Sequence, residues 1–496
     1  MSAIKYKSTR QEGHYVTAAE AILTGIAPDG GLYVPTRFPQ MEKTLEELAA
    51  LDYRQLAVYL LSLYFTDFTE AEIKEAVARA YDAKFTTPQV ARLETKNETH
   101  FLELFHGPTL AFKDMALALL PYLLKLAAQK TGQKKEIVIL TATSGDTGKA
   151  ALEGFADVEG TKIIVFFPEH GVSRVQKRQM VTQKGKNTYV IGIEGNFDDA
   201  QNGVKAIFTD PVMRQKLDNK GYMFSSANSI NIGRLLPQVV YYVWAYLELL
   251  RRGEIVAGQK LNFCVPTGNF GNILAAYYAQ QMGLPVGKLI CASNKNKVLY
   301  DFFTTQIYDR KREFFVTISP SMDILISSNL ERLLYHASQN NAAQVRAWME
   351  ELKNKGSYEI PAEMAAALKI FAAGFATEAE TKAAIREVFE TSGYLIDTHT
   401  AVAYSVLQKY QKQTGDKTPA VVVATASPYK FSKDVLCALE EKFVHVDDFA
   451  LFSEMEKISQ IKIPAPIRDL EKRPVLHQKV CRPEEMPQVV SEILGL

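Results

Sequence analysis

One pattern recurs along this chain from about residue 96 onward. A short run of β-branched and aliphatic residues leads into a turn rich in glycine or small polar residues, and a helical segment follows. The pattern occurs at 135–156, 161–185, 187–208, 260–283, 288–303 and 419–441. The strand segments are apolar almost without interruption, which is typical of strands buried on both faces. Alternating strands and helices of this kind predict parallel sheets covered by helices, an α/β fold.

Two other regions have a helical pattern. Residues 17–95 are mostly helical, and residues 340–390 read as helical segments with charged, solvated faces. A chain of 496 residues is long enough for several domains with substantial cores. We therefore expect a mainly helical N-terminal domain followed by α/β structure.

Charge and cysteine usage exclude several classes of protein. The formal net charge is +1, so neither nucleic acid nor an anionic membrane is expected as a partner. No run approaches the roughly 20 apolar residues of a membrane span, and the N-terminus has no apolar core of signal-peptide length. The cysteines are widely spaced and form no Cys-x-x-Cys pair, which fits a reducing cytosol: Cys264, Cys291, Cys437 and Cys481. We expect a soluble, cytoplasmic protein.

A lysine interrupts an apolar segment at 109–124, which we predict to be a helix. Lys113 and Asp114 are the only charges in it. In one interpretation Lys113 lies on an exposed seam and extends its ammonium group to water. In the other, burial lowers its pKa and gives an amine nucleophile that forms a Schiff base with a carbonyl, including that of pyridoxal phosphate. The second interpretation needs a phosphate site nearby.

Two glycine loops follow predicted strands and open helices, where open α/β sheets bind ligands. They span 143–148 (TSGDTG) and 267–272 (TGNFGN). Backbone N–H groups at such a loop and at a helix N-terminus favour an anion. Neither loop matches a nucleotide-binding fingerprint, so each is equally consistent with a tight strand-to-helix turn.

A third segment, 225–234 (SSANSINIGR), combines small polar side chains with one arginine. It fits either a helix-entry loop rich in capping residues or a second anion site with Arg234 as donor. The histidines show no metal-ligand spacing, and no hydrolase G-x-S-x-G motif occurs, so we expect no metal site. His106 and His399 are interpreted as structural or pocket-lining residues.

The ordered motifs of the chain resemble those of the threonine synthase family. They are GIAPDGGLYVP, HGPTLAFKD, SGDTG, SSANSINIGRLLPQ, PTGNFGNILAA, DTHTAV and VVVATASPYKF. The resemblance covers nearly the whole chain and is to the longer microbial and fungal subgroup. It implies a pyridoxal 5′-phosphate enzyme of fold type II, tryptophan-synthase-β-like, with two parallel-sheet α/β domains and a mostly helical N-terminal domain. The implied divisions are 1–95, a larger cofactor-binding domain of 96–135 and 240–496, and a smaller nested domain of 136–239.

The resemblance also assigns roles to individual residues. Lys113 is expected to form the Schiff base with the cofactor. Thr425, with Ser427 as the less favoured candidate, is expected to face the pyridine nitrogen, and Asp146 the phenolic oxygen. The cofactor phosphate is expected at Gly268, Asn269, Phe270, Gly271 and Asn272. The substrate carboxylate is expected at Ser144, Gly145 and Thr147, and the substrate phosphate at Asn228, Ser229 and Arg234.

The implied reaction is a lyase reaction of threonine biosynthesis, in which O-phospho-L-homoserine and water give L-threonine and phosphate. Three alternatives remain open: a phospholyase that releases a 2-oxo acid, a serine or threonine dehydratase, and a non-catalytic sensor of a phosphorylated amino acid. The sequence leaves both a monomer and a homodimer open.

One motif departs from the expected family pattern. Where many relatives are expected to read T-A-H-P-A-K-F, this chain has Ser427 and Tyr429 in place of the histidine and the second alanine. These two side chains are expected to alter the wall beside the cofactor and therefore to affect substrate selectivity.

Overall fold

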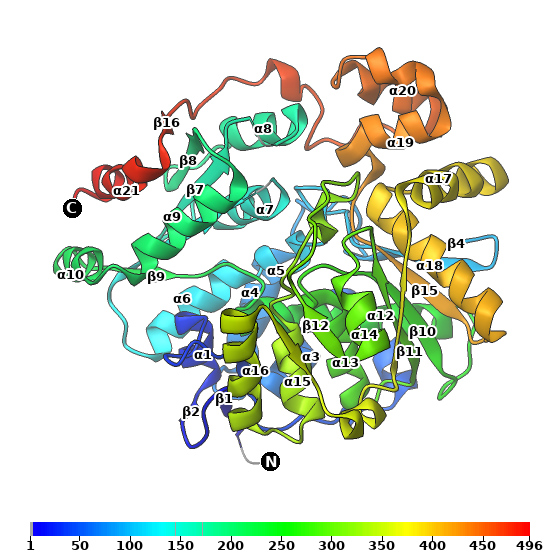
Figure 1. Cartoon of the computed structure of the whole chain (residues 1–496), viewed down its shortest axis with the longest axis horizontal. Helices are drawn as coiled ribbons and strands as arrows, with labels where there is room; N and C mark the ends of the chain where they lie inside the picture. Colours follow the sequence, from blue (N-terminus) through cyan, green and yellow to red (C-terminus); the bar gives the residue numbers. More distant parts are fainter. Residues whose placement is uncertain (1–2, 144, 171) are drawn as a thin grey trace.

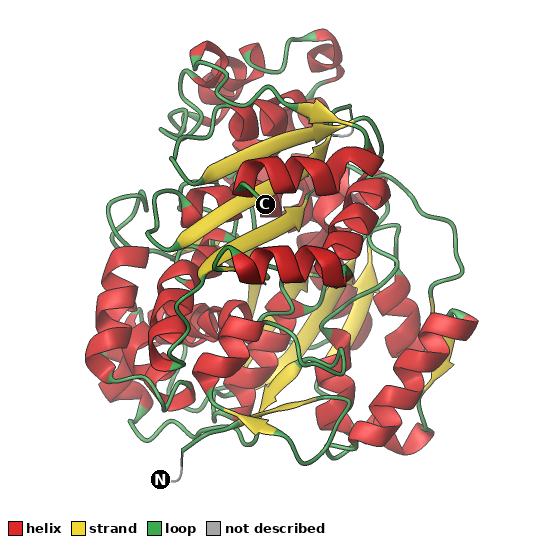
Figure 2. Cartoon of the chain, turned by 90° about the vertical axis from the view of Figure 1, so that its left-hand side faces the viewer, coloured by secondary structure: helices red, strands yellow, loops and turns green. Residues whose placement is uncertain are grey.

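Two parallel sheets, one above the other, form the centre of the computed structural model, which describes residues 3–143, 145–170 and 172–496 (Figures 1 and 2). Over these residues the larger sheet has six strands. They are, in order, β14 (Phe371–Phe375), β11 (Val286–Ser293), β10 (Leu261–Pro266), β15 (Ala420–Ala424), β5 (Thr99–Glu103) and β4 (Arg92–Lys96). Every neighbouring pair is parallel except β4 and β5. The predicted α/β fold is confirmed.

The smaller sheet is parallel throughout. Its order is β16 (Val480–Cys481), β8 (Thr188–Ile193), β7 (Thr161–Pro168), β6 (Glu136–Ala142) and β9 (Tyr222–Ser225). β16 and α21 (Met486–Leu494) come from the end of the chain, which the expected division places in the larger domain. α21 packs against α9 (Phe197–Thr209), because Met486, Val489 and Val490 share a buried cluster with the α9 residues Val204 and Ile207 (Figure 1).

The N-terminal unit combines helices with a small antiparallel sheet of β2 (Tyr15–Val16), β1 (Tyr6–Ser8) and β3 (Tyr33–Pro35). Its helices are α1 (Ala18–Thr24), α2 (Leu45–Ala49), α3 (Tyr53–Tyr64) and α4 (Glu70–Ala80). Each begins with a capping box, which satisfies backbone N–H groups at the helix start.

The N-terminal unit packs on α12 (Val239–Arg251), whose residues from Val239 to Leu249 are all buried. The indole of Trp244 donates to the carbonyl of Ala91 at 2.7 Å. Arg251 donates to the carbonyls of Ala49 and Leu51. The apolar and aromatic residues of α12 therefore serve as a core shared by the N-terminal unit and the larger sheet.

The helix predicted at 109–124 is wrong in its extent. The structure has two helices, α5 (Asp114–Leu117) and α6 (Leu120–Lys130). Leu110 has a φ of 61°, a left-handed conformation that no helix interior accepts, and Pro121 lies in the first turn of α6, where its missing N–H costs nothing. Lys113 therefore lies at the start of a helix rather than in the middle of one.

The region expected to be helical at 340–390 contains two strands. α16 (Ala342–Lys355) and α17 (Glu378–Ser392) are helical as predicted, but β13 (Ser357–Glu359) and β14 lie between them. β14 pairs with β11 at the edge of the larger sheet, and β13 pairs antiparallel with β12 (Ile307–Asp309), which lies earlier in the chain. The run of alanines around Phe371 reads as helical, and pairing with β11 decides its conformation.

Other helices cover the two sheets or extend from them. They include α7 (Asp146–Phe155), α8 (Arg174–Val181), α10 (Pro211–Asn219), α11 (Ile232–Leu235), α13 (Gly271–Gln281), α14 (Val298–Thr305), α15 (Leu330–Ala337), α18 (Thr398–Thr414), α19 (Ser432–Leu439) and α20 (Ala450–Ser459). Among the residues described, no helix is long and apolar enough to span a bilayer.

Candidate active site

Lys113 is presented by a tight turn that the sequence GPTLAFKD builds. The Asp114 carboxylate accepts hydrogen bonds from the backbone N–H and the hydroxyl of Thr109, at 2.7 and 2.5 Å. Gly107 is required here, because a Cβ at this position would lie 2.5 Å from Asp114 Oδ2. The turn thus fixes the backbone immediately before Lys113.

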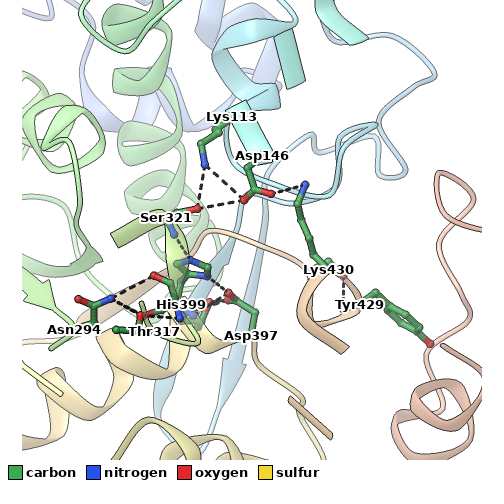
Figure 3. Close-up of polar contacts among 12 residues, drawn as sticks. Lys113, Asp146, Asn294, Thr317, Ser321, Asp397, His399, Tyr429 and Lys430 are labelled. Carbon is green, nitrogen blue, oxygen red and sulfur yellow. Dashed lines mark hydrogen bonds and ion pairs between the residues drawn. The ribbon is translucent and has the colours of Figure 1, made fainter. Parts of the chain in front are cut away.

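The Lys113 side chain is buried, with 11% of its surface exposed. Its Nζ lies 3.7 Å from Asp146 Oδ2 and donates to Ser321 Oγ at 3.3 Å (Figure 3). Burial lowers the pKa of Lys113, Lys430 and Arg234 lower it further, and Asp146 acts in the opposite direction. Of the two interpretations of this lysine, the buried amine is the one that its surroundings support.

Asp146 is the carboxylate that faces this amine. It begins α7, and its Oδ1 lies 3.1 Å from Lys430 Nζ and accepts from Gln176 Nε2 at 3.0 Å. Ser321 Oγ donates to its other oxygen at 3.3 Å. Burial alone would raise the pKa of Asp146, but Lys430 and Lys113 outweigh that effect and hold it well below its usual range. Asp146 is therefore a buried anion.

Sequence reasoning missed Lys430 and Ser321. Lys430 belongs to a motif that was noted, ASPYKF, but no role was assigned to it. Ser321 lies in a segment without a recognised motif, about two hundred residues from Lys113 in sequence. Only the fold brings Lys113, Ser321 and Lys430 into one site.

The segment that carries Ser321 is held by a buried polar network (Figure 3). Asn294, just after β11, donates to Thr317 at 2.8 Å and to Asp323 at 2.7 Å. The backbone N–H of Ser321 donates to His399 Nε2 at 3.2 Å, and His399 Nδ1 lies 2.8 Å from Asp397 Oδ2. His399 is thus a buried residue that holds this loop in place.

The glycine loop 268–272 lies against Ser321. A Cβ on Gly268 would lie 2.6 Å from the Ser321 carbonyl oxygen, so only glycine fits. Phe270 adopts a φ of 62°, and α13 then begins at Gly271. Asn269 is exposed, and its carbonyl accepts from Asn329 Nδ2 at 2.9 Å.

Asn272, in the first turn of α13, has an incompletely satisfied side chain. Its Oδ1 accepts from the hydroxyls of Tyr241 and Tyr242, each at 2.6 Å. Its Nδ2 is buried and has no partner among the described residues. A buried donor without an acceptor is costly, and a phosphate oxygen would satisfy it.

Arg234, the arginine of the third segment, is also buried, in α11. Its Nη1 donates to the Ala227 carbonyl at 2.9 Å, while its Nε has no hydrogen-bond partner within the described part of the chain. No carboxylate of that part forms an ion pair with it, and burial lowers its pKa to about 10. A buried guanidinium without a counter-charge is suited to bind an anion.

The other residues predicted for that segment differ in exposure. Ser229 is half-buried, and its hydroxyl accepts from Asn329 Nδ2 at 3.3 Å. Asn228 is exposed, and its backbone N–H donates to Ser226 Oγ at 3.1 Å. Asn329 contacts both this segment and the glycine loop at Asn269, so the two candidate anion sites are neighbours.

The loop before α7 is the candidate for the substrate carboxylate. Ser144 lies outside the described residues. Gly145 has a φ of 138°, and Thr143 Oγ1 accepts from the backbone N–H groups of Gly145 and Gly148 at 3.0 and 2.9 Å. Thr147 is half-buried in the first turn of α7. The loop leads directly into Asp146, and its role as the carboxylate site stays a prediction.

The C-terminal motif lies at the end of β15. The buried Thr425 accepts from the backbone N–H of Phe112 through its carbonyl, at 2.8 Å. The backbone N–H of Ser427 donates to the Leu110 carbonyl at 3.0 Å, and its side chain caps the short helix η4 (Pro428–Phe431). These bonds join the motif to the lysine turn.

Tyr429 turns away from Lys113 (Figure 3). Its hydroxyl donates to the Ile461 carbonyl, and its ring contacts Phe452 at 6.2 Å between centroids. The expectation that this substitution alters the wall beside the cofactor is therefore not supported for Tyr429.

Other residues considered from the sequence have structural surroundings. His106 Nε2 lies 2.8 Å from Glu103 Oε2, and the Tyr394 hydroxyl donates to the same carboxylate at 2.6 Å. Over the residues that the structure describes, no group of three or more His, Cys, Asp or Glu side chains is arranged to hold a metal ion.

Three known families match this chain. Threonine synthase N terminus matches residues 5–81, Pyridoxal-phosphate dependent enzyme matches residues 88–426, and Threonine synthase, C-terminal matches residues 400–489. The parallel sheets, the buried lysine and the glycine loop at a helix start agree with the second of these. Fold and site define a pyridoxal-phosphate-dependent enzyme of fold type II.

Individual relatives show which family within this class the chain belongs to. The threonine synthase of Saccharomyces cerevisiae is 34% identical over 92% of this chain and 93% of its own length, and that of Pseudomonas aeruginosa is 40% identical over 87% and 90%. Crystal structures of the yeast enzyme and of a PLP-bound threonine synthase from Brucella melitensis superpose with TM-scores of 0.88 and 0.86, at 32% and 38% identity, over 99% of both chains in each case. The chain belongs to the threonine synthase family.

Some relatives are longer than this chain. The proteins named threonine synthase-like 1 from Homo sapiens and Macaca fascicularis are 40% identical over 440 residues, and the chain spans 58% of their length.

Proposed function

We propose that this chain catalyses the conversion of O-phospho-L-homoserine and water to L-threonine and phosphate. The observation that carries the proposal is the buried guanidinium of Arg234, which has no carboxylate partner among the described residues and acts electrostatically on the Lys113 amine. A substrate that carries both an amino group and a phosphate can react beside Lys113 while its phosphate pairs with Arg234. The match to yeast threonine synthase over 93% of that protein's length supports the same reaction.

The residues present fit the cofactor. The fit rests on the glycine at 268, where a Cβ would meet the Ser321 carbonyl, and on the orphaned Asn272 Nδ2. When bound, pyridoxal 5′-phosphate holds the electron pair that remains when a proton leaves the substrate. Lys113 would attach it as a Schiff base, Thr425 would face its pyridine nitrogen and Asp146 its phenolic oxygen. The loop of Gly268, Asn269, Phe270, Gly271 and Asn272 would hold its phosphate.

Lys113 then acts as general base. When its amine is not attached to the cofactor, Lys113 would take the proton from the substrate Cα. A base must be neutral to accept a proton, and the lowered pKa of Lys113 favours that form. Ser321, at 3.3 Å from both Lys113 Nζ and Asp146 Oδ2, keeps the amine in place.

Two separate groups of donors hold the substrate ends. The loop before α7 binds the carboxylate through Ser144, Gly145 and Thr147. The α11 segment binds the phosphate through Asn228, Ser229 and Arg234. Loss of a proton from Cβ and of phosphate from Cγ, protonation at Cγ, addition of water at Cβ and return of a proton to Cα give threonine. Fixing both ends holds Cα near Lys113, which is a large part of catalysis by positioning.

A product assay tests this proposal. The purified chain is incubated with pyridoxal phosphate and O-phospho-L-homoserine, and phosphate, threonine and 2-oxobutanoate are measured together. Equal amounts of phosphate and threonine are expected. Phosphate with mainly 2-oxobutanoate would show a phospholyase instead, and absence of phosphate release would refute the substrate.

The cysteines support an inference about the cellular compartment. All four are free thiols, and Cys264, Cys291 and Cys481 are buried. Free thiols in a folded chain support a reducing compartment, so we infer a cytoplasmic location.

A further inference from the structure

Two buried lysines share one carboxylate in this site. Lys430 Nζ lies 3.1 Å from Asp146 Oδ1, whereas Lys113 Nζ lies 3.7 Å from Asp146 Oδ2. Both lysines belong to the larger sheet's unit, while Asp146 opens α7 of the smaller one. Figure 3 shows the two amines approaching the carboxylate from opposite sides.

Lys430 is the better anchored of the two. Its side chain is 1% exposed, and its Nζ also donates to the Thr109 carbonyl at 2.8 Å, in the turn that presents Lys113. Gln176 donates to the same carboxylate oxygen at 3.0 Å. Asp146 Oδ1 is therefore fully committed to these partners, and Lys113 is left with the longer contact.

We propose that Lys430 is a positioning residue that takes up the charge of Asp146 and thereby frees the Lys113 amine to lose its proton. The proposal rests on the proposed role of Lys113. In a buried site, a cation that lacks a full counter-charge is unfavourable, so its neutral form gains. One carboxylate can neutralise only one of two ammonium groups. The shorter distance to Asp146 shows that the neutralised group is Lys430.

Lys430 also keeps Asp146 ionised when the Lys113 amine loses its proton or becomes bound to another group. An Asp146 that depended on Lys113 alone would lose its counter-charge whenever that amine became neutral or was bound to another group. The second lysine removes this dependence, because its bond to Asp146 does not involve Lys113.

The other charged groups around the pair act in known directions. Arg234 from α11 repels the Lys113 ammonium, as Lys430 does. A protonated His399 from α18 would favour the Asp146 anion. Burial raises the pKa of the Asp114 carboxyl in α5, and the charge of Lys430 opposes that rise. Replacing Lys430 by a neutral residue therefore removes a repulsion from Lys113 and returns Asp146 to it, and both changes raise the pKa of Lys113.

The test measures the Lys113 amine directly, in full-length protein freed of cofactor. Each variant is labelled with acetic anhydride over a series of pH values, and the peptide that carries Lys113 is quantified by mass spectrometry. Lys430→Met should move the midpoint of labelling upward by about one pH unit. Lys430→Arg keeps the charge and should leave the midpoint within a few tenths of a unit. Tyr429→Phe, a change in the same turn that faces away from the site, should leave it unmoved.

Asp146→Asn should shift the labelling midpoint of Lys113 in the opposite direction, downward, because it removes the carboxylate that stabilises the Lys113 ammonium. Thermal unfolding confirms that each variant is folded, and Lys430→Gln replaces Lys430→Met if that variant is not. An unchanged midpoint in a folded neutral variant, or shifts of the same sign for Lys430→Met and Asp146→Asn, would overturn the proposal.

Failure of the proposed function gives a different result. If Lys113 were not the cofactor lysine, Lys113→Ala would keep the visible cofactor band, whatever the labelling midpoints show. If only the role of Lys430 were wrong, Lys113→Ala would lose the band while the midpoint stayed unchanged in Lys430→Met.

Discussion

Lys113 Nζ and Asp146 Oδ2 lie 3.7 Å apart in a buried site, although the two residues belong to units built on different sheets. The contact is longer than a hydrogen bond, and the hydroxyl of Ser321 contacts both groups, at 3.3 Å from each. A buried amine held this loosely by its carboxylate is suited to change its protonation state during a reaction.

Lys113→Ala should remove the visible absorption band that pyridoxal phosphate gives when bound to a lysine. It should also lower turnover about 1,000-fold or more, because attachment and general base are lost together. Spectra and phosphate release measure the two effects. Lys125→Ala, an α6 lysine paired with Glu159 at 2.9 Å outside the site, should change neither. A band that survives in Lys113→Ala would show that another lysine holds the cofactor.

Arg234→Met should lower kcat/KM for O-phospho-L-homoserine about 100-fold, because a charged donor to the phosphate is lost. Inorganic phosphate should raise the unfolding temperature of the wild-type chain but not that of the variant. Arg468→Met, which removes an exposed arginine that donates to the Ile463 carbonyl, serves as the control. Equal stabilisation of Arg234→Met and wild type by phosphate would place the anion elsewhere.

Gly268→Ala should weaken cofactor binding about tenfold or more. The added Cβ lies 2.6 Å from the Ser321 carbonyl oxygen, and a backbone atom cannot give way without moving the loop beside Lys113. Titration of the cofactor-free protein with pyridoxal phosphate, followed by absorbance, measures the effect. Wild-type affinity in this variant would mean that the loop does not form the cofactor cradle.

Asp114→Asn should change how stability depends on pH. Burial raises the pKa of Asp114 from 3.8 to about 6, against the hydrogen bonds from Thr109 and the charge of Lys430. Between these values the folded chain binds more protons than the unfolded chain, so the contribution of Asp114 to stability falls as pH rises through the window. Relative to Asp114→Asn, the wild-type chain should lose about 3 kcal/mol across it. Unfolding midpoints of both proteins, measured below and above the window, check this, and a constant difference would contradict it.

Tyr429→Phe should leave the ratio of threonine to 2-oxobutanoate unchanged, because the side chain faces Phe452 and Ile461 rather than the site. It should cost about 1 kcal/mol of stability through the lost hydrogen bond to the Ile461 carbonyl. Product analysis and thermal unfolding separate the two effects. A changed product ratio would mean that the ring contacts the substrate in the working enzyme.

The elements that sequence reasoning predicted well are those in which local pattern and tertiary position agree. The strands from β6 to β8 and from β10 to β11 were expected because buried parallel strands are apolar throughout, and a turn that contains glycine or asparagine follows each of them. Lys113 and Asp146 were placed in one site because each lies in a motif that resembles a known family. Periodicity failed at 109–124, where Leu110 adopts a left-handed φ that an apolar helical pattern conceals.

The sequence by itself determined the class of fold and the family, and it predicted a set of residues for the cofactor site, since apolar periodicity, turn chemistry and family motifs are local properties of the chain. Tertiary structure alone decided which charged and polar side chains lie close together. Ser321 and Lys430 contact Asp146 although they are 175 and 284 residues from it in sequence. No local sequence pattern predicts these contacts. Electrostatic interactions depend on distance and burial, so the state of the Lys113 amine follows from the assembled site rather than from the segment that contains it.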